Sequence, residues 1–188
     1  MHNSKSSAII DGVLKFQQQL TLCVLIAHAL AFLLLVGIIM YEIIIRYFGY
    51  STVLSVEFSG YMMATLVSWS ACYSLFEKAH VRIDILYQRQ RPIIKSILDA
   101  VSMICFASVA IAVAWSAMNL AVDSWEFKDV SSSILRVPLW IPQISWALGF
   151  LWLAVCSVTL SLRILLALKP HHREEISLLA GATDETFV

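Results

Sequence analysis

The chain has 188 residues, of which 60% are hydrophobic and 14% charged, and its 13 basic residues balance its 13 acidic residues. A typical soluble domain is about 45–50% apolar and about 25% charged. This composition argues against an ordinary soluble enzyme and a disordered tail, and the balanced charge argues against a nucleic-acid-binding protein.

The apolar residues gather in four runs that carry no formal charge, at 16–41, 58–76, 100–122 and 137–162. A bilayer core about 30 Å thick needs roughly 20 helical residues. The sequence therefore predicts an all-α membrane protein: a single domain over residues 1–188 with four transmembrane helices and polar cytoplasmic tails at both ends. The predicted helices cover about 18–47, 54–77, 93–122 and 138–168, and the tails cover 1–15 and 170–188.

Loop charges predict the orientation of these helices. The first run is longer than the core of a signal peptide and has no small-residue cleavage site after it, so we expect it to be retained. Positive residues mark the cytoplasmic side, and they concentrate in the N-terminal segment, after the second helix and after the fourth. Both termini are therefore expected in the cytoplasm, with the first and third connections outside. The connection after the second helix is the most basic, with Lys78, Arg82, Arg89, Arg91 and Lys95.

Small residues recur at helical spacing in two of the predicted helices. The second helix has Gly60, Ala64, Ser68 and Cys72, each four residues apart. The third has Ala107, Ala110, Ala114, Ala117 and Ala121. Small residues let membrane helices approach closely. They indicate either packing within a four-helix bundle or docking onto a larger membrane protein.

Few residues are candidates for chemistry. No charge lies inside the four runs, whereas an ion-coupled carrier normally needs a buried ionisable group. His28 lies near the middle of the first run; we expect a neutral ring hydrogen-bonded to a neighbouring helix, with a proton relay or haem ligand as the alternative. The cysteines form no C-x-x-C pair, and no nucleophile has a base beside it. The sequence thus predicts no enzyme activity, no metal site and no cofactor.

The helix ends carry more polar candidates. Arg46 closes the first helix, and Glu57 opens the second, where an acid either complements the positive helix end or pairs with Arg46. After the second helix, residues 77–87 predict a short interfacial helix, because at helical spacing Ile83, Leu86 and Tyr87 form one apolar stripe. Within it His80 and Asp84 are four residues apart, close enough to hydrogen-bond.

In this order of motifs the chain resembles the small membrane subunit of tripartite ATP-independent periplasmic (TRAP) transporters, the DctQ-like family. The likeness covers about residues 15–168. It is carried by Arg46-Tyr47-Phe48, Glu57, Trp69, His80-Val81-Arg82-Ile83-Asp84, Arg136-Val137-Pro138-Leu139-Trp140, Pro142 and Gly149-Phe150. The chain departs from the family pattern in two places: Ser55-Val56 precede a lone acid at Glu57, and Ser70-Ala71 replace a glycine-alanine pair.

The resemblance implies a multi-pass subunit of the bacterial inner membrane with two protein partners. A periplasmic binding protein captures the substrate, typically an organic acid, and a large membrane subunit carries it inward by an elevator motion driven by sodium, whose ions bind that subunit. The small subunit would brace the static part of the large one and help to seat the binding protein. Interface candidates are Arg46, Glu57, Gly60, Ala64, Ser68, Trp69, His80, Arg82 and Asp84; receptor-docking candidates are Asp123, Glu126, Lys128 and Asp129. The alternatives are a membrane anchor of a redox complex, with or without haem, an independent small carrier, and an unrelated membrane scaffold.

Overall fold

The computed structural model describes residues 2–49, 54–77, 92–133 and 135–167, which form four helices. In chain order these are α1 (His2–Tyr47), α2 (Leu54–Phe76), α4 (Pro92–Glu126) and α5 (Trp140–Ala167). Among the described residues there is no strand, and a single isolated bridge joins Val130 and Pro138. The all-α class predicted from the composition is confirmed. The helix α1 runs through the segment predicted as the N-terminal tail.

Local backbone chemistry stops α4. Lys128 takes a left-handed conformation with φ of 54° directly after the helix. The amide of Asp129 then donates to the carbonyl of Ser124 at 3.0 Å, and the amide of Lys128 donates to that of Trp125 at 3.4 Å. This pair of bonds is the Schellman arrangement, which satisfies carbonyls that the helix end leaves open. The chain thereby turns sharply away from α4.

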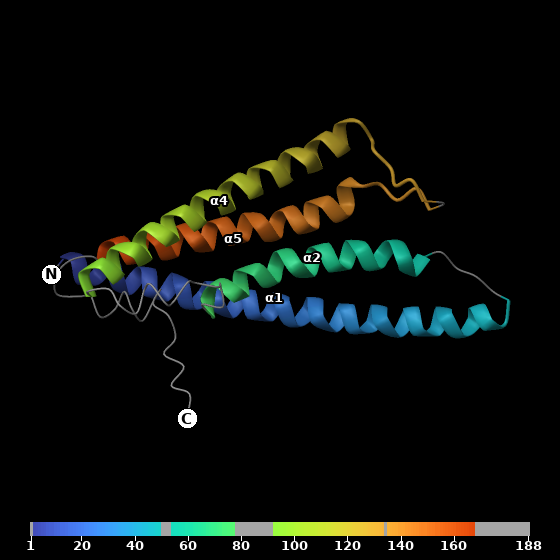
Figure 1. Ribbon diagram of the computed structural model, residues 1–188, viewed down its shortest axis with the longest axis horizontal. Coiled ribbons are helices and arrows are strands. Elements are labelled where there is room, and N and C mark those ends of the chain that lie inside the picture. Colours follow the sequence, from blue (N-terminus) through green and yellow to red (C-terminus); the bar gives the residue numbers. More distant parts are fainter. Residues whose placement is uncertain (1, 50–53, 78–91, 134, 168–188) are drawn as a thin grey trace, which may run out of the picture.

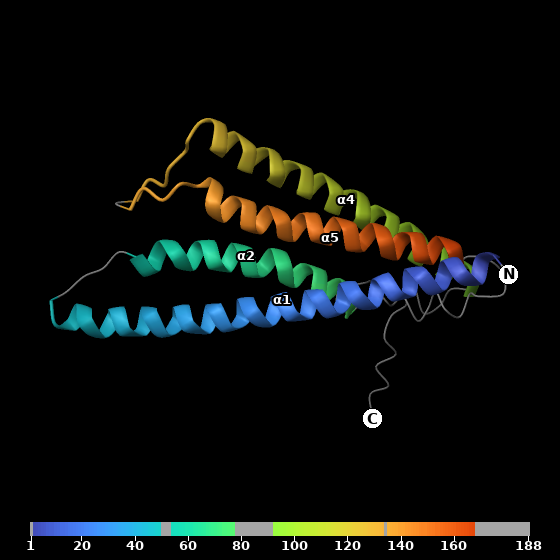
Figure 2. The same cartoon turned by 180° about the vertical axis from the view of Figure 1, so that it is seen from behind.

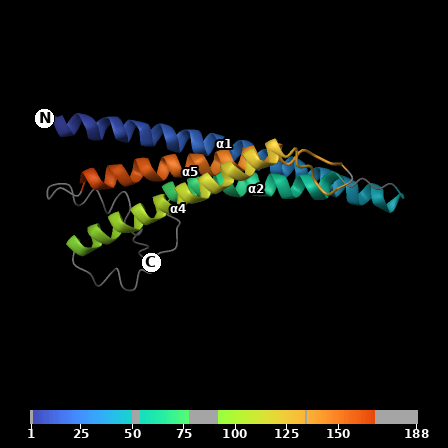
Figure 3. The ribbon, with the colours of Figure 1, turned by 90° about the horizontal axis from the view of Figure 1, so that it is seen from above.

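The four helices lie side by side in an open array rather than a closed bundle (Figure 1, and Figure 2 from behind). The helix α5 packs between α4 and α2, and α2 packs between α5 and α1, which also contacts α5. Within the described part of the chain, the main packing partner of α4 is α5. In the half that carries the N-terminus, α1 and α4 lie on opposite sides of α5 (Figure 3). We call this half the N-terminal end, and the half that carries the α4–α5 connection the hairpin end.

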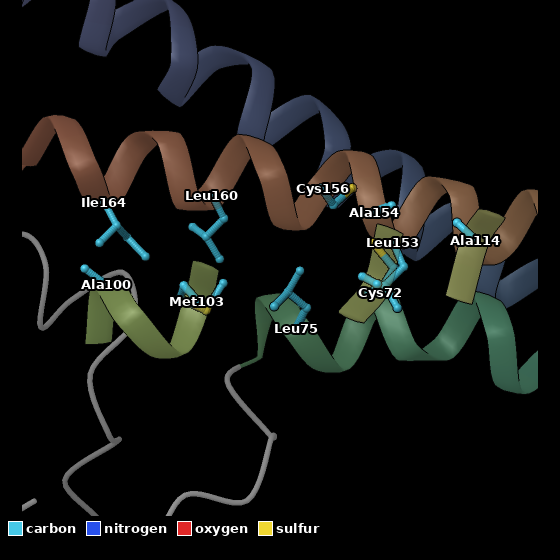
Figure 4. Close-up of a cluster of buried hydrophobic side chains, with 11 residues drawn as sticks. Cys72, Leu75, Ala100, Met103, Ala114, Leu153, Ala154, Cys156, Leu160 and Ile164 are labelled. Atoms are coloured by element: carbon cyan, nitrogen blue, oxygen red, sulfur yellow. The ribbon is translucent and has the colours of Figure 1, made fainter. Parts of the chain in front are cut away.

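The core lies where α2, α4 and α5 meet (Figure 4). Its members come from α2 (Cys72, Leu75), α4 (Ala100, Met103, Ala110, Ala114) and α5 (Leu153, Ala154, Cys156, Leu160, Ile164). Alanines dominate the α4 side, so the backbones of α4 and α5 approach closely along their length. In a membrane this close approach supplies the dispersion contacts that hold helices together.

The two small-residue series differ in how far they are buried. The alanine series of α4 is buried throughout, at 2–6% exposed, so it serves packing against α5. The α2 series divides: Ser68 and Cys72 are fully buried, whereas Gly60 and Ala64 are exposed. Internal packing therefore accounts for the α4 series and for half of the α2 series.

Three of the helices are long and apolar enough to cross a membrane: Ile10–Tyr47, Ile94–Glu126 and Trp140–Leu166. The helix α2 is not among them, because its serines and tyrosines lower its mean hydropathy. Only 6% of the most hydrophobic stretch of α1 is buried, against 50% for α5. With 46 residues α1 is about 69 Å long, more than twice the bilayer core, so part of it extends beyond the bilayer.

Several predictions fall outside the described residues. The interfacial helix and the residues His80, Arg82 and Asp84 lie within 78–91, and the C-terminal tail lies within 168–188.

Candidate functional site

One face of α1 is turned toward the rest of the array. From Thr21 onward its residues recur every seven positions, a spacing that keeps one side of a helix against its neighbour. Gln17 lies one turn before Thr21 on the same face. These positions are buried or half-buried although most of α1 is exposed, and four of the five are polar: Gln17, Thr21, His28, Leu35 and Glu42. Through this polar face, α1 contacts α2 and α5, as described below.

At the N-terminal end, a polar cluster joins α1 to α2 and α5. The Thr21 hydroxyl donates to the Gln17 carbonyl of its own helix at 2.7 Å, which leaves its oxygen as an acceptor. The indole Nε1 of Trp152 donates to that oxygen at 2.9 Å, and the thiol of Cys72 lies 3.6 Å from it. The amide of Gln17 donates to Thr159 Oγ1 at 3.3 Å. The cluster fixes the register of the three helices.

An ion pair lies beyond this cluster. Arg163, near the end of α5, donates through Nε to one carboxylate oxygen of Asp11 at 2.7 Å and through Nη2 to the other at 3.3 Å. The side chain of Arg163 is 9% exposed and that of Asp11 is 43% exposed. Two parallel bonds of this kind are the favourable geometry for an arginine–carboxylate pair. The pair joins the N-terminal part of helix α1 to the end of α5.

Near the middle of the array Trp69 connects three helices. Its ring stacks on that of His28 in α1, with the ring centroids 5.9 Å apart and the planes 26° from parallel. Its Nε1 donates to the carbonyl of Ser145 in α5 at 3.3 Å. Nδ1 of His28 lies 2.8 Å from the Val24 carbonyl, so the bond expected to a neighbouring helix goes to the histidine's own helix instead. The Val24 carbonyl lies one turn earlier in α1, within reach of Nδ1, and the sequence prediction did not consider it.

A groove opens on the hairpin side of this pair. It has a volume of about 370 Å³ and lies over α2, with α1 on one side and α5 on the other. Its walls are mostly apolar and contain no charged residue. The lining comes from α1 (Ala27, His28, Ala31), α2 (Phe58, Tyr61, Met62, Thr65) and the start of α5 with its preceding residue (Val137, Ile141, Pro142, Ser145). The polar side chains of His28, Tyr61, Thr65 and Ser145 interrupt its apolar walls.

At the hairpin end the α4–α5 connection folds back on itself. The amide of Ser131 donates to the Val137 carbonyl at 2.9 Å, and that of Leu139 donates to the Asp129 carbonyl at 3.0 Å. We call residues 129–133 and 135–139 the outer hairpin, because they lie at the end of the array that is far from the N-terminus. At its base the rings of Trp125 and Trp140 meet edge to face, with centroids 4.7 Å apart. The two tryptophans that flank this loop in the sequence therefore clamp the two ends of the hairpin together.

The outer hairpin contacts α2 through Glu57. One carboxylate oxygen accepts a bond from Tyr61 at 2.6 Å, and the other accepts one from the hydroxyl of Ser133. The hydroxyls of Ser131, Ser133 and Tyr61 favour the charged carboxylate and hold the pKa of Glu57 below its ordinary value. Glu57 also lies in the first turn of α2, which suits the positive helix end. It is thus held by hydroxyls of the hairpin and of its own helix.

The predicted docking residues gather at the same end. Asp123, Glu126, Lys128 and Asp129 are all exposed, at the end of α4 and the start of the outer hairpin. Arg46 is exposed near the end of α1. The structure therefore brings Glu57 to the outer hairpin but not into an ion pair with Arg46.

Sequence reasoning missed most of the helix-to-helix contacts. The seven-residue polar repeat of α1 was visible and would have indicated its inner face. No signal marked Ser131 and Ser133 as partners of Glu57, since serines are ordinary loop residues.

Within 2–49, 54–77, 92–133 and 135–167 no three His, Cys, Asp or Glu residues gather as metal ligands.

Comparison with known proteins assigns the fold to a family. The family model described as the DctQ component of tripartite ATP-independent periplasmic transporters matches residues 35–167, more than two thirds of the chain. No curated protein and no solved structure matches it significantly. The matched range includes Trp69, the outer hairpin and the α2 and α5 walls of the groove. It excludes the α1 wall of the groove, with Ala27, His28 and Ala31, and also Asp11, Gln17 and Thr21.

Proposed function

The chain belongs to the DctQ family of TRAP transporter components, and from this premise we propose that it braces the static part of a large elevator-type membrane subunit. That large subunit would carry an organic acid inward on a sodium gradient. A soluble binding protein on the outer side would deliver the acid. The small subunit would bind neither the acid nor the sodium.

The observation that carries this proposal is an open array of membrane helices whose buried charged residues, Glu42, Asp99 and Arg163, lie toward the ends of their helices and not midway along them. No Asp, Glu, Lys or Arg lies in the four uncharged runs of the sequence. Carriers that work alone place ionisable groups or broken helices at the middle of the bilayer. An open array also exposes far more helix surface than a closed bundle, which suits a subunit that widens another protein.

We further propose that α2 is the fourth transmembrane helix and that the N-terminal end faces the cytoplasm. The helix α2 packs between α1 and α5, both long enough to span the bilayer, so it runs through the bilayer beside them. Its serines do not oppose this placement, because Ser68 and Ser70 bond to carbonyls of the preceding turn. The charge bias of the loops supports the orientation.

The outer hairpin and the end of α4 are proposed to help seat the binding protein. Acidic and basic side chains lie exposed there, beside a hairpin held to α2 by Glu57. Exposed charges steer association in a salt-dependent way. Reversing Asp123, Glu126 and Asp129 together should raise the concentration of binding protein needed for half-maximal uptake without releasing the large subunit. An unchanged half-maximal concentration would remove these residues from receptor docking.

The main test is reconstitution with and without the partner. Liposomes that contain this chain together with a TRAP large subunit and binding protein should accumulate an organic acid when a sodium gradient is imposed. Liposomes that contain this chain alone should not. Accumulation by the chain alone, or full uptake by the large subunit without it, would contradict the proposal.

A further inference from the structure

We propose that the groove over α2 receives a hydrogen-bond-donating side chain from a helix of the large membrane subunit, with His28 as the acceptor. The face of the array that holds this groove would then be the docking face. This inference rests on the proposed function, since it names the surface on which the large subunit sits.

The groove has the form of a socket for inserted side chains. Its volume of about 370 Å³ is at the small end of the range of ligand pockets, about 300–1,000 Å³. Toward the N-terminal end it is lined by His28, whose ring stacks on that of Trp69, and Trp69 is in turn held by its bond to Ser145. Toward the hairpin end it reaches Val137 and Pro142. On the α1 side the wall is low, because Ala27 and Ala31 have small side chains.

The chemistry of His28 specifies what the socket accepts. A backbone carbonyl can only accept a hydrogen bond, so Nδ1 carries the proton that it shares with the Val24 carbonyl at 2.8 Å. In the neutral ring Nε2 is then an acceptor, and it makes no hydrogen bond within the described residues. No charged residue lines the groove. The Nε2 acceptor of His28 therefore lacks a donor.

A protein helix meets this requirement better than lipid does. Lipid tails carry no donor, and a polar atom that faces hydrocarbon without a partner costs free energy. A helix can bring a hydroxyl, amide, amine or indole donor to the middle of the bilayer. Small residues such as Ala27 and Ala31 also let a second backbone approach α1. Only 6% of the most hydrophobic stretch of α1 is buried within this chain, so its surface is available for such an approach.

Photocross-linking in the assembled complex tests the docking face directly. A benzophenone amino acid at Ala31 or Met62 lies in the groove, whereas one at Val109 or Trp115 lies on the exposed side of α4. We expect cross-links to the large subunit from the two groove positions and not from the two α4 positions. Cross-links from α4 alone, or cross-links to lipid alone from the groove, would overturn the inference. Failure of the two subunits to co-purify at all would instead overturn the proposed function.

Substitution of the acceptor gives a second, independent test. His28→Phe keeps a ring for Trp69 to stack on but removes the acceptor, and His28→Gln restores an acceptor. Interhelical hydrogen bonds in membranes correspond to about threefold to tenfold in affinity. We expect His28→Phe to weaken retention of the large subunit by about that factor, His28→Gln to recover part of it, and the matched control Trp115→Phe to change nothing. Full retention by His28→Phe, with an unaltered melting midpoint of the isolated chain, would overturn the role of His28.

Discussion

The two ends of the helix array are held together in different ways. At the N-terminal end, Thr21 collects contacts from α2 and α5, and the Asp11–Arg163 pair links α1 to α5. At the hairpin end, the helices leave an open groove, and the outer hairpin is attached to α2 through Glu57. The Thr21 hydroxyl and the Asp11 carboxylate are hydrogen-bonded within the chain, although Gln17 Oε1 in the same cluster is buried without a partner. We therefore expect the N-terminal end to set the shape of the array and the hairpin end to offer the surface for assembly.

The largest effect is expected where the two ends meet, at Gly149 in α5. A Cβ added there would clash with Ser68 Oγ and would lie 2.9 Å from Ser68 Cβ and 3.1 Å from the Ser68 carbonyl carbon. Because backbone atoms cannot move aside, Gly149→Ala should force α2 and α5 apart and destabilise the array by about 1–3 kcal/mol. Thermal unfolding of the purified protein in detergent measures this. Gly60→Ala is the matched control, because no atom lies within 4 Å of the added carbon.

Thr21→Val tests the polar cluster at the N-terminal end. The valine has nearly the same shape but removes the acceptor of the Trp152 indole and the partner of the Cys72 thiol. Since both groups are enclosed between helices, we expect a loss of about 1–2 kcal/mol in stability. Ser108→Ala is the control, because the hydroxyl of Ser108 is exposed and bonds only to the carbonyl of Cys105 in its own helix. Equal melting midpoints for the two variants would show that the cluster does not hold the helices together.

Asp11→Asn tests the ion pair beyond the cluster. Asp11 is substantially exposed, so solvent screens the pair and its loss should cost only about 1 kcal/mol. A double-mutant cycle with Arg163→Gln isolates the pairwise contribution from the other contacts of Arg163. We also expect the effect to shrink at high salt, because the pair lies partly in water. A coupling energy near zero would remove the pair from the set of contacts that orient α1.

The difference between the ends also explains what could be predicted from the sequence. Helix positions were predictable because uncharged runs of bilayer length leave a membrane protein few alternatives. The packing role of the α4 alanines was one of two interpretations that their spacing allowed, and the buried face decided between them. The contacts of Thr21 and Glu57 were not predictable, because each depends on where a distant helix or hairpin places a common residue. Trp69 was singled out from its place in the family pattern, yet its contacts with His28 and Ser145 emerge only from the fold.

The smallest effect is expected at the attachment of the outer hairpin. The pKa of Glu57 is lowered in the folded protein, chiefly by the hydroxyls of Ser131 and Ser133, so the folded state binds fewer protons than the unfolded state. The stability that this carboxylate contributes is therefore complete above its ordinary pKa of 4.5 and is lost as the pH falls further. Ser133→Ala should flatten this acid dependence, whereas the neighbouring Ser132→Ala should keep it. Melting midpoints recorded from roughly pH 3.5 to 7 measure the difference. Identical profiles for the two variants would mean that the bond from Ser133 does not lower the pKa of Glu57, and that the attachment of the hairpin to Glu57 depends on Ser131 instead.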